Sequence, residues 1–507
     1  MPPEQPDAEL LRTPTSPYEV GIGTSHQTTI SGVPQQNSLS ASVASPVGGF
    51  SNFSTASTLH GADSGQRSFN DLEQSNIVTP TLPGNADVPL PYGLRETVPM
   101  DERDRTLVEH FVDNVLGLVF PIIEVYQQGP ARAREILLSL ETNKTYFHCC
   151  MSVSAIHLKT NMGLGSAQID HDIMKHRYKA VSHLCQDLAR GTDHKKMLDA
   201  TLGMIFFHCS VGAPNDYLPD IPWNDHLNAA LKLLNKFNGT PSSFSLSLVS
   251  WIDILGATML GKMPTFAHTY RSRHLGGISS GLRELMGCDD RIMYLISEVA
   301  CLDALRSAGY VDDVSLCHHV AALSTQLDHT EAADPTLESP LAPSGAIHPQ
   351  KLTKNISAVF RIAARIYLYS LLPGFDCHQP SNLNMVKSVA DILPYIPSGP
   401  YGFDRSLVWP LLITGSSSVA SSPFRRILTE RAAFLGDMGD FGSFGKMFGL
   451  LQEVWRLADD PAPSPLVGSI PKRSSSPSLG TPGISIRKQR VHWRKVMRRN
   501  GWHFLLI

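Results

Sequence analysis

The sequence predicts an all-α protein, with one large helical domain of antiparallel helix pairs behind a disordered N-terminal tail. Three observations lead to this fold class. Apolar residues recur at steps of three and four along most of the chain after Met100, alternating strand patterns are nearly absent, and residues 1–98 lack such periodicity. The chain has 507 residues, which is enough for one large core or for two or three domains.

The first segment, residues 1–98, has the composition of a disordered tail. Between residues 13 and 68, nineteen positions are Ser or Thr, and Gly, Pro and Gln fill much of the rest. Such a segment buries too little apolar surface to offset the entropy that it loses on ordering. We therefore expect a Ser/Thr/Pro/Gly-rich tail at 1–98 and a helical domain at 99–507.

The helical segments begin at Met100. The string MDERDRTLVEHF opens with acidic residues, which favour the positive end of a helix dipole. Four later segments each carry the single apolar stripe of an amphipathic helix. The predicted stripes are Met174, Tyr178, Val181, Cys185 and Leu188; Trp223, Leu227, Ala230, Leu234 and Phe237; Ile292, Leu295, Val299 and Leu302; and Ile356, Phe360, Ala363 and Tyr367.

Four breaks interrupt the helical pattern. They fall near 328–350, 373–382, 394–405 and 459–485, where Gly, Pro, Ser and Asp accumulate. Because a helical pattern resumes after every break, we interpret these segments as loops within one domain.

Composition argues against several classes of protein. The net charge of −3 gives no general attraction to nucleic acid or to a membrane surface. No apolar run reaches the roughly 18–20 residues that span a bilayer, and the N-terminus lacks the basic start and apolar core of a secretory signal. The eight cysteines are irregularly spaced, which indicates free thiols in a reducing compartment.

Two strings resemble catalytic motifs but lack the context that the chemistry needs. GATMLGKM (256–263) matches a phosphate-binding loop as far as Lys262, but Met263 stands where Ser or Thr would hold magnesium. GISSG (277–281) would need a buried strand before Ser279 to form a nucleophile elbow, and RSRHLG precedes it instead. Both strings are interpreted as structural.

Three clusters of cysteine and histidine lack the spacing of a zinc site. They are HCC (148–150), HC (208–209) and CHH (317–319), and the chain contains no C-x2-C pair. Buried free cysteines commonly pack as small apolar residues. We therefore expect no catalytic residues, no metal ligands, no cofactor-binding residues and no enzymatic activity.

Seven segments, taken together and in order, resemble the fungal-specific transcription factor domain, the helical regulatory region that usually follows a fungal binuclear zinc cluster. They are FHCCMSVSAIHLKT (147–160), MLDATLGMIFFHC (197–209), WNDHLNAALKLL (223–234), GGISSGLRELMGCDDRIMYLISEVACLDAL (276–305), SLVWPLLITGSSS (406–418), LLQEVWRLADD (450–460) and VHWRKVMRRNGWHFLLI (491–507). The resemblance implies structural roles for His157, Trp223, His226, Leu227, Gly287, Trp409, Pro410, Trp455, Trp493, Met497 and Trp502.

The basic C-terminal segment is predicted to be the last helix of the domain. Trp493 and Met497 are four residues apart, with Val496 beside them, and form an apolar side. The cations of this helix, Arg494, Lys495, Arg498 and Arg499, are expected on a basic outer face. The resemblance places this helix last in the fold, so the residues after it are expected to anchor the C-terminus in the core: Trp502, Leu505, Leu506 and Ile507.

A bipartite basic pattern lies in the Ser/Pro-rich loop before that helix. Lys472 and Arg473 are followed, after thirteen residues, by Arg487, Lys488 and Arg490. The pattern predicts a nuclear localisation signal, and a solvated loop that is merely basic is the alternative.

The sequence departs from the family in one respect. Zinc-cluster regulators use six cysteines to read DNA, and residues 1–146 contain none. Two explanations stay open: the sequence starts after a missed exon, or this member has no DNA-binding module of its own. Zinc is expected as a cofactor only if a missing N-terminal cluster exists.

The resemblance implies nuclear regulation of RNA polymerase II transcription. The expected partners are the transcription machinery or a DNA-binding partner protein, with promoter DNA contacted only indirectly unless the N-terminus is truncated. No membrane partner is expected, and a homo- or heterodimer stays open. The alternatives are a helical interaction scaffold that does not bind DNA, or a metabolite-sensing protein.

Overall fold

The computed structural model describes residues 100–126, 134–162, 167–191, 193–209, 222–236, 242–331, 336–459 and 491–506. The regular elements in these ranges are all helices, and one isolated bridge joins Leu341 and Ile347. The predicted all-α class is confirmed. The predicted tail at 1–98 and residues 460–485 of the predicted basic loop lie outside the described residues.

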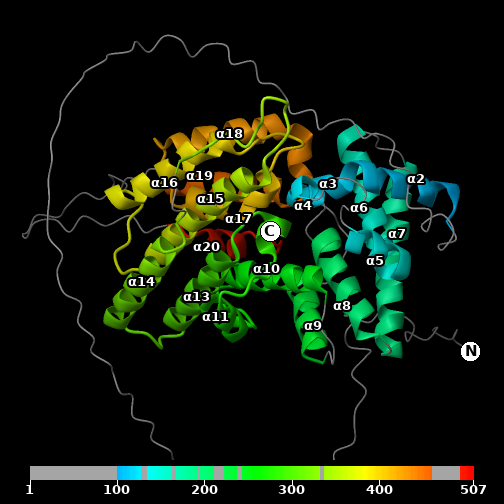
Figure 1. The fold of residues 1–507 in the computed structure, drawn as a ribbon, viewed down its shortest axis with the longest axis horizontal. Coiled ribbons are helices and arrows are strands. Elements are labelled where there is room, and N and C mark those ends of the chain that lie inside the picture. The colour runs from blue at the N-terminus through cyan, green and yellow to red at the C-terminus, as the bar shows by residue number, and fades with distance from the viewer. Residues whose placement is uncertain are drawn as a thin grey trace, which may run out of the picture. The chain divides into compact units, whose positions relative to one another are not determined.

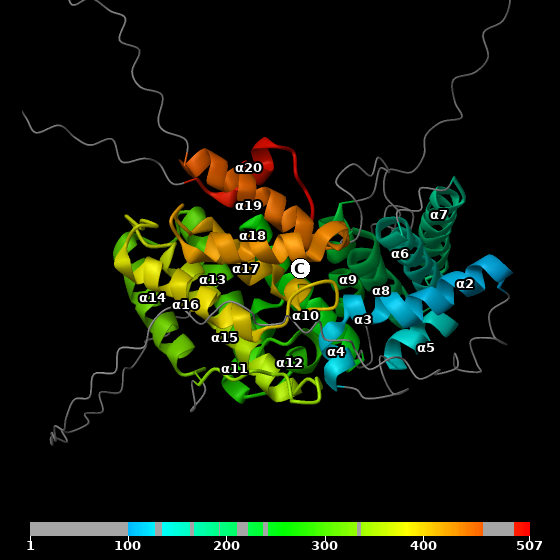
Figure 2. The same ribbon diagram turned by 90° about the horizontal axis from the view of Figure 1, so that it is seen from above.

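The first group of helices, coloured blue to teal in Figure 1, precedes residue 210. It comprises α2 (Glu102–His110), η1 (Phe111–Val115), α3 (Leu116–Val119), α4 (Pro121–Tyr126), α5 (Arg134–Thr142), α6 (Lys144–Met162), α7 (Ala167–Arg190), α8 (His194–Gly203) and η2 (Met204–Cys209). The long helices α6 and α7 lie side by side in both views (Figures 1 and 2). Only residues 163–166 separate them, so they form an antiparallel pair.

The second group runs from α9 to α15. It comprises α9 (Trp223–Lys236), α10 (Ser243–Leu260), α11 (Ala267–Gly276), α12 (Leu282–Met286), α13 (Asp290–Ser307), α14 (Asp313–Asp328) and α15 (Pro349–Tyr369). The stripes predicted on α13 and α15 are confirmed, because every residue of both stripes is at most 5% exposed. These two helices pack on each other and form the centre of the core.

The third group packs on the second and ends the chain. It comprises α16 (Pro380–Ile392), η3 (Leu393–Tyr395), η4 (Asp404–Leu407), α17 (Val408–Ser416), α18 (Pro423–Leu435), η5 (Gly436–Asp440), α19 (Ser443–Asp459) and α20 (Trp493–Arg499). Helix α17 packs on α15 and on α19, and α20 lies along α19, as Figure 2 shows.

Several helices begin after an Asp or Ser whose side chain caps the first turn. The Asp101 carboxylate accepts a hydrogen bond from the amide of Asp104 at 2.7 Å and caps α2. Asp193, Ser242 and Asp312 cap α8, α10 and α14 in the same way. Such a side chain satisfies one of the amides that the first turn leaves without a helical partner.

The stripe predicted on α7 is wrong at Met174 and Tyr178, whereas Val181 and Leu188 are partly buried against the core. The α7 side chains facing the core are Ile169, Asp172, Ile173, His176, Arg177, Ala180 and Leu184. Met174 and Tyr178 of the predicted stripe are 47% and 77% exposed. The physical reason is that the buried face of α7 carries a polar network, so the helix turns three polar residues inward and leaves two large apolar residues outside.

A close helix crossing depends on one glycine. A Cβ atom on Gly415 of α17 would stand 2.5 Å from Leu451 Cδ1 of α19, well inside van der Waals contact. The carbonyl of Gly415 also accepts a hydrogen bond from the Trp455 indole at 2.8 Å. The crossing of α17 and α19 therefore needs both the missing side chain and the exposed carbonyl.

We predict that Gly415→Ala lowers the free energy of unfolding by about 1–3 kcal/mol, because the added methyl overpacks the crossing. Gly449→Ala is the matched control, since Gly449 is a helical glycine of α19 whose Cβ would contact nothing within 4 Å. The control should be neutral, or more stable by about 0.4–1 kcal/mol. Urea denaturation measures both, and equal effects would contradict the crossing argument.

Candidate functional site

The C-terminal helix α20 is docked as the sequence predicts. Trp493, Val496 and Met497 are 3%, 3% and 7% exposed and face the core. After the helix, Leu505 and Leu506 are fully buried, and the carbonyl of Leu505 accepts a hydrogen bond from Ser443 Oγ at 3.1 Å. Ile507 lies outside the part of the chain that is described.

Arg494 does not lie on the predicted basic outer face, which corrects that expectation. Its side chain is 14% exposed and points into the protein. Arg494 Nε donates to the carbonyl of Thr258 at 2.7 Å, Nη1 to Asp303 Oδ2 at 2.7 Å, and Nη2 to the Tyr367 hydroxyl at 3.0 Å. The guanidinium turns inward because a buried carboxylate and a helix-end carbonyl meet its rigid fork of donors.

The groups around Arg494 also bind one another. The Tyr367 hydroxyl donates to Asp303 Oδ2 at 2.7 Å, and the Trp409 indole donates to Thr258 Oγ1 at 2.8 Å. The Arg494 guanidinium lies 5.8 Å from the Tyr367 ring centre and 5.0 Å from that of Trp493, within cation–π range. We call Thr258, Asp303, Tyr367, Trp409 and Arg494 the Arg494 junction.

The junction joins five helices that are far apart in the sequence. Its residues come from α10, α13, α15, α17 and α20. Burial on its own would lower the pKa of Arg494, but Tyr367 and Asp303 together raise it. Burial raises the pKa of Tyr367 well above its ordinary value, so this hydroxyl stays protonated and can donate. The arrangement is an ion pair in which each of the three guanidinium nitrogens of Arg494 donates to an acceptor.

The other cations of α20 lie where the sequence predicts. Lys495, Arg498 and Arg499 are exposed and form the basic outer face of the helix. One cation of this short helix, Arg494, thus points inward, and the adjacent Lys495 is exposed.

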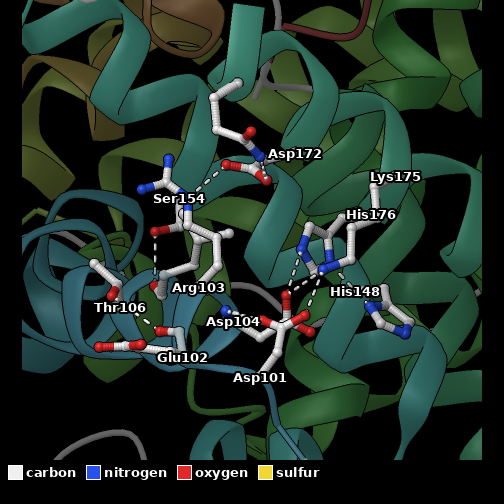
Figure 3. Close-up of polar contacts among 12 residues, drawn as sticks. Asp101, Glu102, Arg103, Asp104, Thr106, His148, Ser154, Asp172, Lys175 and His176 are labelled. Atoms are coloured by element: carbon white, nitrogen blue, oxygen red, sulfur yellow. Dashed lines mark hydrogen bonds and ion pairs between the residues drawn. The ribbon is translucent and has the colours of Figure 1, made fainter. Parts of the chain in front are cut away.

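A second polar network joins α2 to α6 and α7 (Figure 3). Asp104 is 6% exposed and accepts a hydrogen bond from Lys175 Nζ at 2.7 Å. His176 Nε2 lies 3.3 Å from the same carboxylate oxygen, and His176 Nδ1 lies 2.9 Å from His148 Nδ1. Beside them, Arg103 Nε donates to Asp172 Oδ2 at 2.7 Å.

The environment of this network shifts the pKa values of its members. Burial would raise the pKa of Asp104, but hydrogen bonds and charges from His176 and Lys175 hold it well below its ordinary range. Burial, followed by the nearby His176 and Lys179, lowers the pKa of His148 to about 3. The network therefore pairs an ionised Asp104 with a neutral His148.

A further histidine pair connects the same helices. His110 of α2 and His157 of α6 face each other, with His110 Nε2 2.9 Å from His157 Nδ1. Burial, and then the charges of His110 and Arg405, lower the pKa of His157 to about 4.

The residues to which the resemblance gives structural roles occupy the core or its edge. His157, Trp223, His226, Leu227, Trp409, Pro410, Trp493 and Met497 are buried, whereas Trp455 and Trp502 are partly buried. Gly287 ends α12 with φ +82°, and a Cβ on it would stand 3.0 Å from Ile356 Cδ1. Of these residues, Trp409 belongs to the Arg494 junction and the Trp493 ring lies beside the Arg494 guanidinium.

The two catalytic-looking strings occupy structural positions. GATMLGKM forms the end of α10, where Gly261 adopts the left-handed conformation that ends the helix and Gly256 lets the Trp223 ring approach. Ser279 lies in the loop before α12 and donates to Asp290 Oδ2 at 2.8 Å. Asp290 also accepts from the amides of Ser280 and Leu282, so this carboxylate shapes the loop.

The HCC cluster lies in α6, HC at the end of η2 and CHH in α14. Cys149 and Cys150 are buried in α6, where burial raises the pKa of Cys150 well above its ordinary value. Among the described residues, no three His, Cys, Asp or Glu side chains come together as metal ligands. None of the helices in the described ranges is long and apolar enough to cross a membrane.

The predicted nuclear localisation residues lie outside the described ranges. They are Lys472, Arg473, Arg487, Lys488 and Arg490. The inward position of Arg494 was not predicted; the signal for it in the sequence is Asp303, an acid within the apolar string ACLDAL of α13. A carboxylate on an apolar helix face implies a buried partner.

We predict that Arg494→Met lowers the free energy of unfolding by about 3–5 kcal/mol, because it leaves Asp303 buried without its cation. Lys495→Met is the matched control at the adjacent exposed position and should change stability by at most about 0.5 kcal/mol. Urea denaturation of both variants measures the difference. Similar losses in the two variants would mean that the junction contributes nothing specific.

We predict that stability falls as the pH drops from 7 to 5. Unfolded histidine titrates near about 6.5, whereas His148 and His157 titrate at about 3 and about 4 in the folded protein. Between these pKa values the unfolded chain binds protons that the folded chain does not. The contribution of the two histidines to the free energy of unfolding is therefore complete above the unfolded pKa and is lost as the pH falls below it. Two such groups cost about 3–4 kcal/mol over this interval. His148→Asn should remove about half of that loss in urea titrations, and an unchanged loss would contradict the assignment.

The comparisons with known proteins agree on one family. The model of the family described as "Fungal specific transcription factor domain" matches residues 106–507. The chain is 42% identical to "Transcriptional regulatory protein pro1" of Neurospora crassa over 529 aligned residues, which cover 99% of this chain and 74% of that protein. It is 26% identical to "Transcription factor dibT" of Pestalotiopsis microspora over 252 residues, which cover 45% of this chain and 39% of that protein. No solved structure matches the chain significantly.

Proposed function

Because the chain belongs to the family of the fungal specific transcription factor domain and functions in the regulation of transcription, we propose that it acts in the nucleus, without enzymatic activity, on genes transcribed by RNA polymerase II. The observation that carries the proposal is the extent of the match. The match to the family model covers residues 106–507, and the relative at 42% identity aligns with 99% of the chain.

We further propose that residues 99–507 act as one regulatory domain. Support comes from the continuity of the core, which includes side chains from α2 at one end of the described chain and from α20 at the other. The Arg494 junction ties the last helix to α10, α13 and α15, and Trp409 of α17 joins it through its hydrogen bond to Thr258. In this account the junction keeps the family domain in a single folded arrangement.

The helical domain is proposed to bind the transcription machinery or a DNA-binding partner protein. Promoter DNA would then be contacted through that partner, or through a zinc cluster if the natural protein carries one beyond this sequence. A homo- or heterodimer stays a prediction from the family resemblance.

Nuclear entry is proposed to depend on the basic residues of the loop between α19 and α20: Lys472, Arg473, Arg487, Lys488 and Arg490. Their bipartite spacing supports this role. The three exposed cations of α20, namely Lys495, Arg498 and Arg499, belong to a docked helix and provide a control set of nearby basic residues.

The experiment measures the localisation of the tagged chain and the transcriptome of the same strains. Changing the five loop cations to Gln should move the fluorescently tagged chain from the nucleus to the cytoplasm and reproduce the expression changes of a deletion strain. Changing the three cations of α20 to Gln should leave both readouts as in wild type. A wild-type chain outside the nucleus, together with an unchanged transcriptome after deletion, would contradict the proposed function.

A further inference from the structure

The outward side of α20 carries three cations that no carboxylate neutralises. Lys495, Arg498 and Arg499 are exposed, and within the described part of the chain none of them forms an ion pair. Arg498 Nε donates to the carbonyl of Arg494 at 3.4 Å, a contact that leaves its charge in place. The helix therefore presents positive charge to solvent on the side opposite its buried residues.

The acid beside this group, Glu453 of α19, already has a partner. Arg456 Nε and Nη2 donate to its two carboxylate oxygens at 2.7 and 2.8 Å. These hydrogen bonds lower the pKa of Glu453, and the charge of Arg499 adds a smaller contribution. The Glu453 charge is thus shared with Arg456 and does not balance the cations of α20.

The end of α10 extends this surface. Gly261 lies against the junction, because a Cβ on it would stand 3.5 Å from Arg494 Nη1. The next residue, Lys262, is exposed and likewise forms no ion pair with the residues that the structure describes. Next to it in the sequence, Leu260 and Met263 are 43% and 49% exposed. We call four residues the α20 basic surface: Lys262, Lys495, Arg498 and Arg499.

The chemistry of this surface favours an acidic peptide as its occupant. Nucleic acid phosphates would pair with the cations, but a sugar–phosphate backbone offers no apolar groups to cover Leu260 and Met263. A peptide that carries both carboxylates and apolar side chains complements both features.

A segment of this chain outside the described ranges has that composition. Residues 4–19, which we call the acidic segment, hold four acids and one base, and two adjacent leucines follow the third acid. Three of the acids fall within six residues: Glu4, Asp7 and Glu9. Residues 1–99 as a whole have nine acids and three bases. The acidic segment therefore has the charge that the α20 basic surface lacks.

The length of chain between the acidic segment and the helical domain permits the contact. About 80 residues separate Glu19 from Met100, and a chain of that length can span up to about 260 Å. Because both partners belong to one molecule, contacts that are too weak to hold two separate molecules together can hold the segment in place.

We propose that the acidic segment docks on the α20 basic surface, where its carboxylates pair with the four cations and its two leucines lie against Leu260 and Met263. The docked segment excludes polyanions from these cations. The proposal goes beyond the proposed regulatory function, and the contact is measured on the purified full chain without any localisation or transcriptional readout.

The experiment is carbodiimide cross-linking, which joins a carboxylate to a lysine amine that it contacts. We expect Lys262 or Lys495 to be joined to Glu4, Asp7 or Glu9, as identified by mass spectrometry. An equal mixture of isotope-labelled and unlabelled chain should show that the joined peptides come from one molecule. The yield should fall in 1 M sodium chloride, since salt screens exposed charges.

A double variant tests the role of the arginines. Arg498→Gln with Arg499→Gln keeps both reactive lysines and should lower the cross-linking yield by about 3- to 10-fold, as expected for the loss of two exposed ion pairs. Arg105→Gln with Arg291→Gln is the matched control, because it removes two exposed arginines from α2 and α13. The control should leave the yield unchanged.

A second measurement uses a DNA duplex of random sequence at low salt. Neutralising the acids of the segment should raise the affinity of the full chain for this duplex several-fold, because the vacated cations then bind phosphates. The variant is Glu4→Gln, Asp7→Asn and Glu9→Gln. A control that neutralises three other acids of residues 1–99 should raise the affinity less: Asp63→Asn, Asp71→Asn and Glu73→Gln.

Three results would overturn the proposal. The first is the absence of cross-links between the two lysines and the acidic segment, or their formation only between different copies of the chain. The second is an equal fall in yield in both arginine double variants. The third is equal duplex affinity in the wild type and the neutralised variant, which would mean that the acidic segment does not occupy these cations and that they are free to bind nucleic acid phosphates.

Discussion

The ion pair between Arg494 and Asp303 is the interaction on which the C-terminal part of the structure depends. Helix α20 has seven residues, too few to be stable without tertiary contacts, and residues 460–490 separate it from α19. Its position therefore relies on buried apolar residues such as Trp493 and on the guanidinium beside them. Apolar contacts alone would tolerate small rotations of the helix. The 2.7 Å contacts of Arg494 to Asp303 and to the Thr258 carbonyl permit only one arrangement, and they fix α20 against helices from the middle of the chain.

A second network of buried polar side chains lies near the other end of the domain. Asp104, Lys175 and His176 connect α2 to α7 through a network that takes the place of an apolar seam. Buried polar groups of this kind cost desolvation energy, and partners with good geometry offset that cost. Together the two networks place specific directional contacts near both ends of a core that is otherwise held by non-directional burial. A regulatory domain that must present a defined surface to partners is expected to benefit from such contacts.

Sequence reasoning predicted the fold class and the stripes of α13 and α15, because these helices bury faces that are almost wholly apolar. It misplaced the first half of the α7 stripe, because periodicity assigns His176 and Arg177 to solvent and Met174 and Tyr178 to the core, and the structure has the reverse. It also assigned Arg494 to the surface. The pair of Arg494 and Asp303 joins residues that are distant in the sequence, and local sequence patterns carry no information on such contacts.

The most direct test of the central claim is a double-mutant cycle on the ion pair, with unfolding free energies measured by urea denaturation for wild type, Arg494→Met, Asp303→Asn and the double variant. If the two side chains act as one buried pair, the double variant should lose much less than the sum of the single losses, with a coupling energy of about 1–3 kcal/mol. Additivity to within about 0.5 kcal/mol would show that the two residues act independently and that the ion pair does not fix α20.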